Sequence, residues 1–118
     1  MEIKTIQIDS DTFLIFKGTT YIQMNVKDIV YLETFDKYVT IKTKDGKKFN
    51  VCCSLTDITK YLCSEYITVS RGFLINKRYI SYLSKQATDK SVYDLVLTVP
   101  ACIRKVSEYT AKRILKQL

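Results

Sequence analysis

An arginine, a hydroxyl and a glycine stand side by side in the segment Thr68–Asn76, directly before an apolar run. Arg71 lies between Ser70 and Gly72, and glycine allows the chain to turn tightly there. A guanidinium held outward beside a rigid strand can bind a guanine edge with two hydrogen bonds or grip a phosphate. Arg71 taken alone favours a solvated loop charge or a structural salt bridge over a contact with nucleic acid.

Positive charge is concentrated after residue 28. The 118 residues carry 19 Lys and Arg against 12 Asp and Glu, which gives a net charge of +7. Residues 1–28 contribute −1 and residues 29–118 contribute +8. Such an excess on a small domain suits a polyanionic partner, although a soluble protein with a high pI has the same composition.

Length and composition indicate one domain over residues 1–118. Hydrophobic residues make up 47% of the chain, which argues against disorder. The many β-branched residues, nine Tyr and five Phe indicate a mainly β protein. No apolar run approaches the roughly 18 residues that span a bilayer, and Met1 opens no signal peptide. We therefore expect no membrane partner and a cytoplasmic location.

The residue types required for common catalytic sites are missing from this chain. It has no histidine, no glycine-rich phosphate loop and no C-x-x-C pair. We therefore expect no enzymatic activity, no metal and no cofactor. The cysteines are expected to be reduced thiols, most of them buried: Cys52, Cys53, Cys63 and Cys102.

Alternating apolar residues and turn residues predict strands through most of the chain. Asp45-Gly46 is a strong hairpin signal, and Ser54 followed by Asp57 resembles a capping box that opens a short helix over about 55–63. A basic closing helix is predicted from apolar residues at helical spacing: Ile103, Val106, Thr110, Ile114 and Leu118. The strands are expected over 12–17, 21–25, 29–34, 38–43, 47–52, 66–69, 73–75, 79–83 and 91–99.

Several segments resemble, in their order and spacing, one known family. Asp28-Ile29-Val30-Tyr31-Leu32-Glu33 is followed by Lys37-Tyr38-Val39-Thr40-Ile41, by Ser54-Leu55, and by Val69–Asn76 with Ile80 beyond it. Together they resemble the LytTR-type DNA-binding domain of bacterial response regulators and other transcriptional regulators. The resemblance extends from about Thr12 to the C-terminus, so the domain core is expected over about 12–118.

The resemblance implies an elongated arrangement of small antiparallel sheets with one short internal helix and a C-terminal helix. It implies sequence-specific binding of double-stranded DNA by a regulator of a two-component system, with loops inserted into successive major grooves. A homodimer on repeated half-sites is compatible with it. Three loops would face DNA, and their residues are Lys37, Tyr38 and Thr40 in the first, Ser70, Arg71 and Gly72 in the second, and Arg104 and Lys105 before the last helix.

The second loop departs from the family pattern, which often has histidine before the arginine and serine after it. Ser70 and Gly72 stand there instead, so the resemblance assigns the loop but not individual base contacts. Two other functions stay open. One is RNA or single-strand binding with Tyr38, Tyr66 and Tyr79 as stacking platforms, and the other is a basic module that binds an acidic protein.

Some polar residues near these segments are expected to be structural. Asn76 is expected to form hydrogen bonds at a strand end, and Asp28 and Glu33 to pair within the protein. Lysines around the Asp45-Gly46 hairpin are expected to be solvated or to protect a sheet edge: Lys42, Lys44, Lys47 and Lys48.

Overall fold

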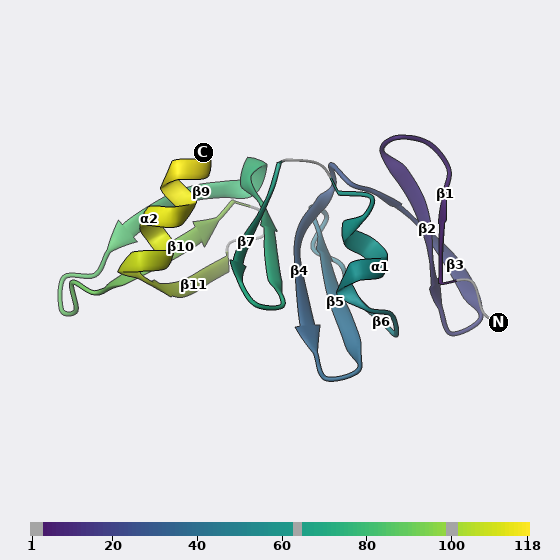
Figure 1. The fold of residues 1–118 in the computed structure, drawn as a ribbon, viewed down its shortest axis with the longest axis horizontal. Helices are drawn as coiled ribbons and strands as arrows, with labels where there is room; N and C mark the ends of the chain where they lie inside the picture. The colour runs from purple at the N-terminus through teal and green to yellow at the C-terminus, as the bar shows by residue number, and fades with distance from the viewer. Residues whose placement is uncertain (1–3, 63–64, 99–101) are drawn as a thin grey trace.

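Three antiparallel sheets follow one another along the molecule (Figure 1). The computed structural model describes residues 4–62, 65–98 and 102–118. These measure 50 × 27 × 22 Å, so the domain is elongated as expected. The first sheet holds β1 (Thr5–Gln7), β2 (Thr12–Lys17) and β3 (Thr20–Asn25). The central sheet has the order β6-β5-β4-β8-β7, formed by β4 (Ile29–Phe35), β5 (Tyr38–Thr43), β6 (Lys48–Val51), β7 (Tyr66–Ser70) and β8 (Phe73–Asn76).

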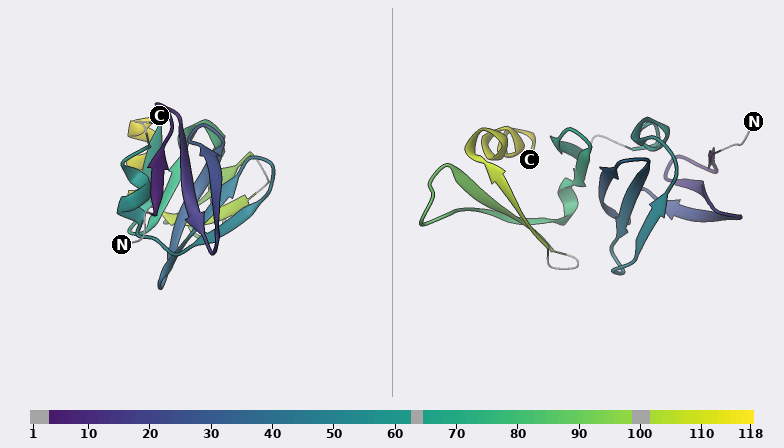
Figure 2. Two further views of the ribbon diagram at one scale, coloured as in Figure 1. Left: turned by 90° about the vertical axis from the view of Figure 1, so that its right-hand side faces the viewer. Right: turned by 90° about the horizontal axis from the view of Figure 1, so that it is seen from below.

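The third sheet forms the other end of the molecule and carries the C-terminal helix. Its order is β11-β10-β9, formed by β9 (Ile80–Lys85), β10 (Val92–Leu97) and β11 (Cys102–Ser107). Helix α2 (Glu108–Gln117) lies on one face of this sheet, as the view from below shows (Figure 2). Short helix α1 (Leu55–Thr59) lies beside the central sheet, and the 3-10 turn η1 (Lys77–Tyr79) leads from β8 into β9.

The central sheet is buried on both faces, which gives the domain two hydrophobic clusters. Ile29 and Leu32 of β4 pack toward the first sheet and α1, whereas Val30 and Tyr31 pack toward the third sheet and α2. A strand buried on both faces carries a continuous apolar run rather than an alternating one. The run Ile29-Val30-Tyr31-Leu32 therefore marks the strand that joins the two clusters.

Most predicted strands are present, and so is the capped internal helix. Ser54 and Asp57 form the predicted capping box: the amide of Asp57 donates to the Ser54 hydroxyl at 3.2 Å, and the amide of Ser54 donates to the Asp57 carboxylate at 3.1 Å. The helix ends at Thr59, earlier than predicted. Strand β1 was not predicted, because Thr5–Gln7 is too short to show alternation.

The prediction that the closing helix includes Ile103 and Val106 was wrong. Residues 102–107 form β11, and α2 begins only at Glu108. Ile103 is 64% exposed, so its spacing from the buried Ile114 was coincidental. The start signal is Ser107, whose hydroxyl accepts from the amide of Thr110 at 3.2 Å.

Cys52 is exposed, just after β6 ends at Val51. The prediction that most of the four cysteines are buried stays a prediction. Cys53 is partly buried, and burial, helped by the nearby Asp57 carboxylate, raises the pKa of its thiol to about 11. Cys63 and the side chain of Cys102 lie outside the described parts of the chain.

Asn76 is the structural hydrogen-bonding residue that the sequence predicted. It is 0% exposed, its side-chain amide donates to the carbonyl of Ile29 at 3.2 Å, and its carbonyl oxygen accepts from the amide of Arg78 at 3.0 Å. The hydroxyl of Tyr66 donates to the same Ile29 carbonyl at 3.0 Å. Asn76 thus joins the end of β8 to the start of β4 and opens η1.

We predict that Asn76→Ala lowers the free energy of unfolding by about 1–3 kcal/mol, because buried hydrogen bonds are lost and polar groups are left without a partner. Urea denaturation followed by circular dichroism measures the change. Asn25→Ala is the matched control, since Asn25 caps the amide of Lys27 at 2.9 Å at an exposed turn. Its cost should be about 0.5 kcal/mol. Equal costs for the two variants would contradict this role for Asn76.

Candidate nucleic-acid interface

The first two predicted loops lie at the same edge of the central sheet. Strand β8 pairs antiparallel with both β4 and β7, so β4 and β7 run in the same direction. The turn after β4 and the turn after β7 therefore emerge together, at the lower edge in Figure 1. The amide of Thr34 donates to the carbonyl of Gly72 at 2.7 Å, which joins the second loop to the end of β4, just before the first loop.

The second loop is a tight turn whose glycine is required. Ser70 ends β7, Arg71 is exposed, and Gly72 has a φ of +80°. A Cβ on Gly72 would lie 3.2 Å from the Cβ of Thr34, closer than ordinary packing allows. Both the backbone conformation and the contact with β4 favour glycine. The presence of Gly72, where the family pattern often has serine, thus has a structural reason in this chain.

The first loop presents a lysine between two aromatic residues. Asp36 takes a positive φ of 49°, and Lys37 beside it is exposed. Phe35 and Tyr38, 48% and 38% exposed, lie on either side with ring centroids 6.4 Å apart. Thr40 is buried and donates to the side-chain carbonyl of Asn50 at 2.8 Å, so its hydroxyl already has a partner.

Arg104 and Lys105 do not lie on a loop before the last helix, which corrects the expectation. Both belong to β11, where neighbouring side chains point to opposite faces. Arg104 points inward with the buried Val106, whereas Lys105 is exposed with Ile103. β11 continues to Ser107, so both residues lie within the strand and not at the start of the helix.

The guanidinium of Arg104 lies between a carboxylate and two aromatic rings. Both of its terminal nitrogens donate to the carboxylate oxygens of Glu33, one of them at 2.8 Å. Its Cζ is 4.4 Å from the ring centroid of Phe73 and 5.8 Å from that of Tyr31. The prediction that Glu33 pairs within the protein is confirmed, and so is that for Asp28, which pairs with Lys44 at 3.2 Å.

Two hollows lie on either side of Arg104 and gather the predicted residues. The residues that line the first come from β4, β7, β8, β11 and α2: Glu33, Val69, Ser70, Phe73, Arg104, Lys105, Val106, Ser107 and Thr110. The second opens over β4, β5 and β6: Tyr31, Glu33, Phe35, Tyr38, Thr40, Lys48, Asn50 and Arg104. Residues of all three predicted groups therefore meet around the Arg104–Glu33 pair.

Sequence reasoning missed the hollow-lining residues Asn50, Ser107 and Thr110. Asn50 could have been found from the Asp45-Gly46 hairpin, whose register places it opposite Thr40. Ser107 and Thr110 have a helix-cap spacing that the longer predicted helix concealed.

Three exposed cations of the predicted set have no hydrogen-bond or ion-pair partner among the residues that the structure describes. They are Lys37, Arg71 and Lys105, from three different elements. Arg104 differs from them, since its guanidinium is held by Glu33 and by aromatic rings. Charges without an internal partner can form contacts with an external anion at little structural cost.

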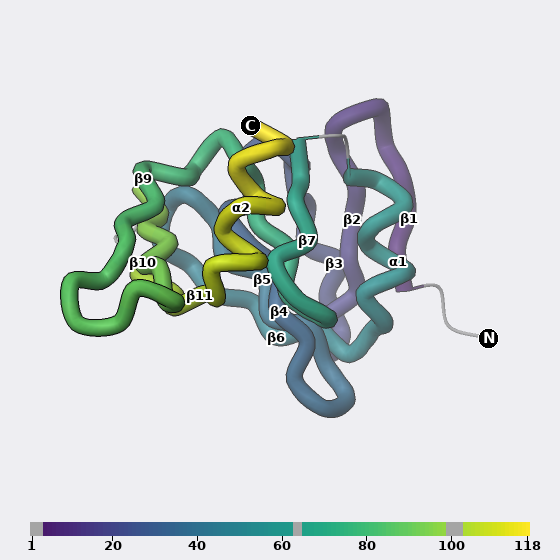
Figure 3. Tube along the Cα trace, turned by 60° about the vertical axis from the view of Figure 1, so that its left-hand side comes forward, coloured from purple at the N-terminus to yellow at the C-terminus, as the bar shows by residue number. Residues whose placement is uncertain are grey.

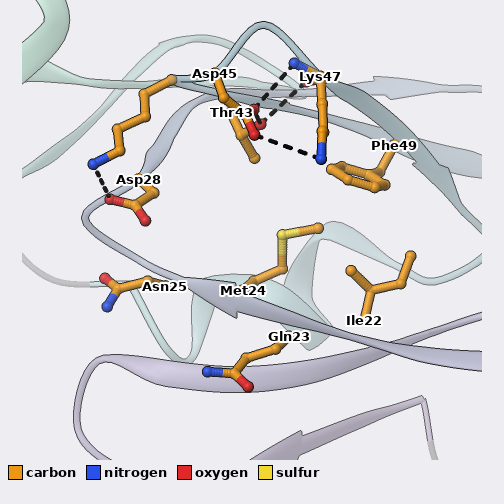
Figure 4. A pocket seen from close by; sticks show the side chains of 10 residues that line it. Ile22, Gln23, Met24, Asn25, Asp28, Thr43, Asp45, Lys47 and Phe49 are labelled. Atoms are coloured by element: carbon orange, nitrogen blue, oxygen red, sulfur yellow. Dashed lines mark hydrogen bonds and ion pairs between the residues drawn. The ribbon is translucent and has the colours of Figure 1, made fainter.

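A further hollow lies between β3 and the turn that joins β5 to β6, and its charged residues pair with one another (Figure 4). Lys44 pairs with Asp28, and Lys47 lies 3.8 Å from the Asp45 carboxylate. The hydroxyl of Thr43 and the amide of Lys47 donate to that carboxylate and lower its pKa. The hollow thus carries balanced charge, unlike the surface around Arg71.

Two of the tyrosines considered as stacking platforms are partly buried, and their hydroxyls have internal partners. Tyr66 donates its hydroxyl to the carbonyls of Val26 and Ile29, and Tyr79 donates to the carbonyl of Lys27 at 2.8 Å. Both rings also pack against the hydrophobic clusters. Of the three, Tyr38 alone presents an exposed ring.

Among the described residues, no three or more His, Cys, Asp or Glu side chains are grouped so that they could hold a metal ion. In the same parts of the chain, no helix is long and apolar enough to cross a membrane.

Comparison with known proteins gives consistent matches. The model of the LytTr DNA-binding domain matches residues 19–118. The sensory transduction protein LytT of Bacillus subtilis (strain 168) is 34% identical over 102 residues, which cover 86% of this chain and 41% of that protein. The chain thus spans about two fifths of this relative's length. A solved LytTr DNA-binding domain from Bacillus cereus matches with a TM-score of 0.70 and 18% identity over 91% of this chain and 95% of that one, which supports the fold.

We predict that Glu33→Gln lowers the free energy of unfolding by about 1–3 kcal/mol, between the values for exposed and for buried ion pairs. The carboxylate side chain is 16% exposed and Arg104 is 34% exposed, so part of the interaction is shielded from water. Asp28→Asn breaks the ion pair with Lys44, in which the side chains of Asp28 and Lys44 are 43% and 56% exposed. It should lower the free energy of unfolding by less than about 1 kcal/mol. Urea midpoints at an unchanged slope measure both. A smaller loss for Glu33→Gln than for Asp28→Asn would contradict the prediction.

Proposed function

Because this chain belongs to the LytTr DNA-binding domain family, we propose that it binds specific sequences of double-stranded DNA within a bacterial transcriptional regulator, without enzymatic activity of its own. The observation that carries the proposal is a set of three exposed cations that have no internal partner among the described residues. Lys37 and Arg71 lie on the two neighbouring turns, and Lys105 lines the hollow that also contains Ser70. The net charge of +7 supports the same partner.

We assign base recognition to the second loop. Arg71 stands on a turn held by Gly72 and by the hydrogen bond from Thr34, so its guanidinium starts from a well-defined backbone position. An arginine on such a support can bind the O6 and N7 atoms of guanine in the major groove. Ser70 beside it can donate to a phosphate or a base edge.

Phosphate contacts are assigned to lysines on neighbouring elements. Lys37 lies on the adjacent turn, and Lys105 lines the hollow that also contains Ser70. Tyr38 can pack against the sugar-phosphate backbone with its exposed face. Thr40 and Arg104 have internal partners, so we assign them to positioning the surface and not to DNA contact.

The shape of the domain supports contact with successive major grooves. Its longest dimension is 50 Å, which exceeds the rise of about 34–36 Å over one turn of B-DNA. A domain lying along the duplex can therefore reach beyond one helical turn. We include in the proposal a cytoplasmic location and a pair of copies bound to repeated half-sites, as expected for many regulators.

Binding to duplex DNA is favoured over the two alternatives. Single-strand binding uses exposed aromatic platforms, and two of the three candidate tyrosines are partly buried with their hydroxyls bonded within the protein. Binding of an acidic protein would use the same cations but would not need the tightly held turn around Arg71. Both alternatives are outcomes of the experiment below.

We expect the domain to retain a subset of duplex fragments from a genomic pool that share a sequence motif. Affinity for the selected duplex should fall steeply with salt, with a slope of log K on log salt near about −5 if about five or six phosphates are contacted. Sequencing the retained fragments and titrating the selected duplex over a salt series measure both. Two copies of the motif at fixed spacing would support paired binding.

Three results would contradict this function. They are retention without a shared motif, a flat salt response, and displacement of the selected duplex by its separated strands at equal concentration. The last result would favour single-strand binding, and the absence of DNA binding altogether would favour the protein-interaction alternative.

We expect Arg71→Ala to reduce discrimination between the selected duplex and a scrambled duplex by about 1–3 kcal/mol, the value of a bidentate arginine–guanine contact. Lys47→Ala should weaken both duplexes equally and slightly, because Lys47 is 69% exposed at the far edge of the sheet and offers charge only. Binding titrations at one salt concentration measure the comparison. If Arg71→Ala lowers the affinity for both duplexes by the same factor, Arg71 contacts only phosphate. If the variant is folded and neither affinity changes, the second loop does not contact DNA.

A further inference from the structure

The strand that leads into the second loop contains a β-bulge. Thr68 pairs with Leu74 and Ser70 pairs with Phe73, so Val69 has no partner residue of its own on β8. The bulge lies immediately before the turn that carries Arg71. Bulges bend a strand, and they redirect the side chains that follow. The direction in which Arg71 leaves the sheet therefore depends on how the backbone at Val69 is held.

An arginine from the C-terminal helix binds the backbone at this bulge. The Nη2 atom of Arg113 donates to the carbonyl of Val69 at 2.6 Å. Helix α2 lies alongside β7, the outermost strand of the central sheet, which makes this contact possible (Figure 3). The hydrogen bond is charge-assisted, and it joins residues 44 positions apart in the chain.

Arg113 is not the residue that stability alone would favour at this place. Its Nε atom is buried and has no hydrogen-bond partner among the residues that the structure describes. A buried donor without a partner costs free energy. The neighbouring Lys112 shows the ordinary arrangement for this helix, since it is 67% exposed and pairs with Glu108 at 3.5 Å.

The other end of the loop is held independently. The carbonyl of Gly72 accepts from the amide of Thr34, and the Gly72 backbone lies against the Thr34 side chain. The segment Ser70–Gly72 is thus fixed on one side by β4 and on the other by α2. Removal of either contact leaves the loop held by the pairing of β7 with β8 and by one tertiary contact only.

We propose that Arg113 is a positioning residue for DNA recognition: by holding the carbonyl of Val69 at the bulge, it sets the direction of the loop that presents Arg71. The proposal rests on the proposed function of that loop. It predicts that the C-terminal helix influences which sequence is bound without touching a base.

The test compares Arg113→Met with Lys112→Met. Each variant removes one positive charge from α2, but Arg113→Met alone removes the donor to Val69 while keeping an unbranched side chain. Affinities are measured at fixed salt for a duplex selected from a random library by the unaltered protein and for its scrambled version. Amide hydrogen exchange of residues 70–72 is measured without DNA, and circular dichroism checks the fold.

Arg113→Met is expected to lower the ratio of the affinity for the selected duplex to that for the scrambled duplex. The decrease should not exceed the contribution of one arginine–guanine contact, which is about 5- to 150-fold. Lys112→Met should leave the ratio unchanged. In a chain that already carries Arg71→Ala, the second substitution Arg113→Met should have little further effect on the ratio, because both act through one contact. Residues 70–72 should exchange faster in Arg113→Met, and Arg113→Lys, which keeps a charged donor, should restore part of the ratio.

Several results would overturn the proposal. An equal loss on both duplexes with a salt slope reduced by about one would make Arg113 a direct phosphate contact. A ratio loss that adds in full to that of Arg71→Ala, or unchanged exchange at residues 70–72, would show that Arg113 does not act through the loop. If Arg113→Met fails to fold, Arg113→Ala, which also lacks the donor, would refute the proposal by leaving both the exchange of residues 70–72 and the ratio unchanged.

Failure of the proposed function gives a different pattern. If Arg71→Ala leaves the ratio unchanged, the second loop does not read bases. The exchange measurement needs no DNA, so it still decides whether Arg113 holds the loop.

Discussion

The Arg104–Glu33 ion pair is the interaction on which the interface surface depends. It joins β11 of the third sheet to β4 of the central sheet, and the guanidinium stacks on Phe73 at 4.4 Å. A guanidinium suits this place because it can form two parallel hydrogen bonds with a carboxylate while its flat face rests on a ring. Because Arg104 lines both hollows, the pair decides how Lys105 and Ser70 on one side lie relative to Tyr38 on the other.

The charges of the domain divide into those with internal partners and those without. Glu33, Asp28 and Asp45 neutralise basic side chains within the fold, whereas Lys37, Arg71 and Lys105 have no partner in the described ranges. The net charge of +7 therefore understates how uneven the surface is. Electrostatic attraction to a polyanion depends on such local excess, and the rigid turn around Gly72 adds the fixed geometry that sequence discrimination requires.

The sequence predicted the strands and turns best where the signal was local. Asp45-Gly46 and the Ser54–Asp57 capping box each act within a few residues, and both were correct. The buried run Ile29–Leu32 also marked its strand. The last helix was misplaced because Ile103 and Val106 match helical spacing, while the pairing of β11 with β10 depends on residues far along the chain. Long-range pairing overrides a local periodicity whenever it buries more apolar surface or satisfies more backbone groups.

The sequence by itself determined the fold class, the family resemblance and the turns and strands that hold Arg71 and Tyr38, because turn chemistry and apolar patterning are local properties. Only the tertiary structure decided which arginine has an ion-pair partner among the described residues and which has none. Arg71 and Arg104 are the same residue type, and only the packing of β11 against β4 places Glu33 beside one of them. The bulge at Val69 and its contact with Arg113 were likewise decided by how α2 lies along β7, since a backbone carbonyl acquires a side-chain partner 44 residues away only after the chain has folded.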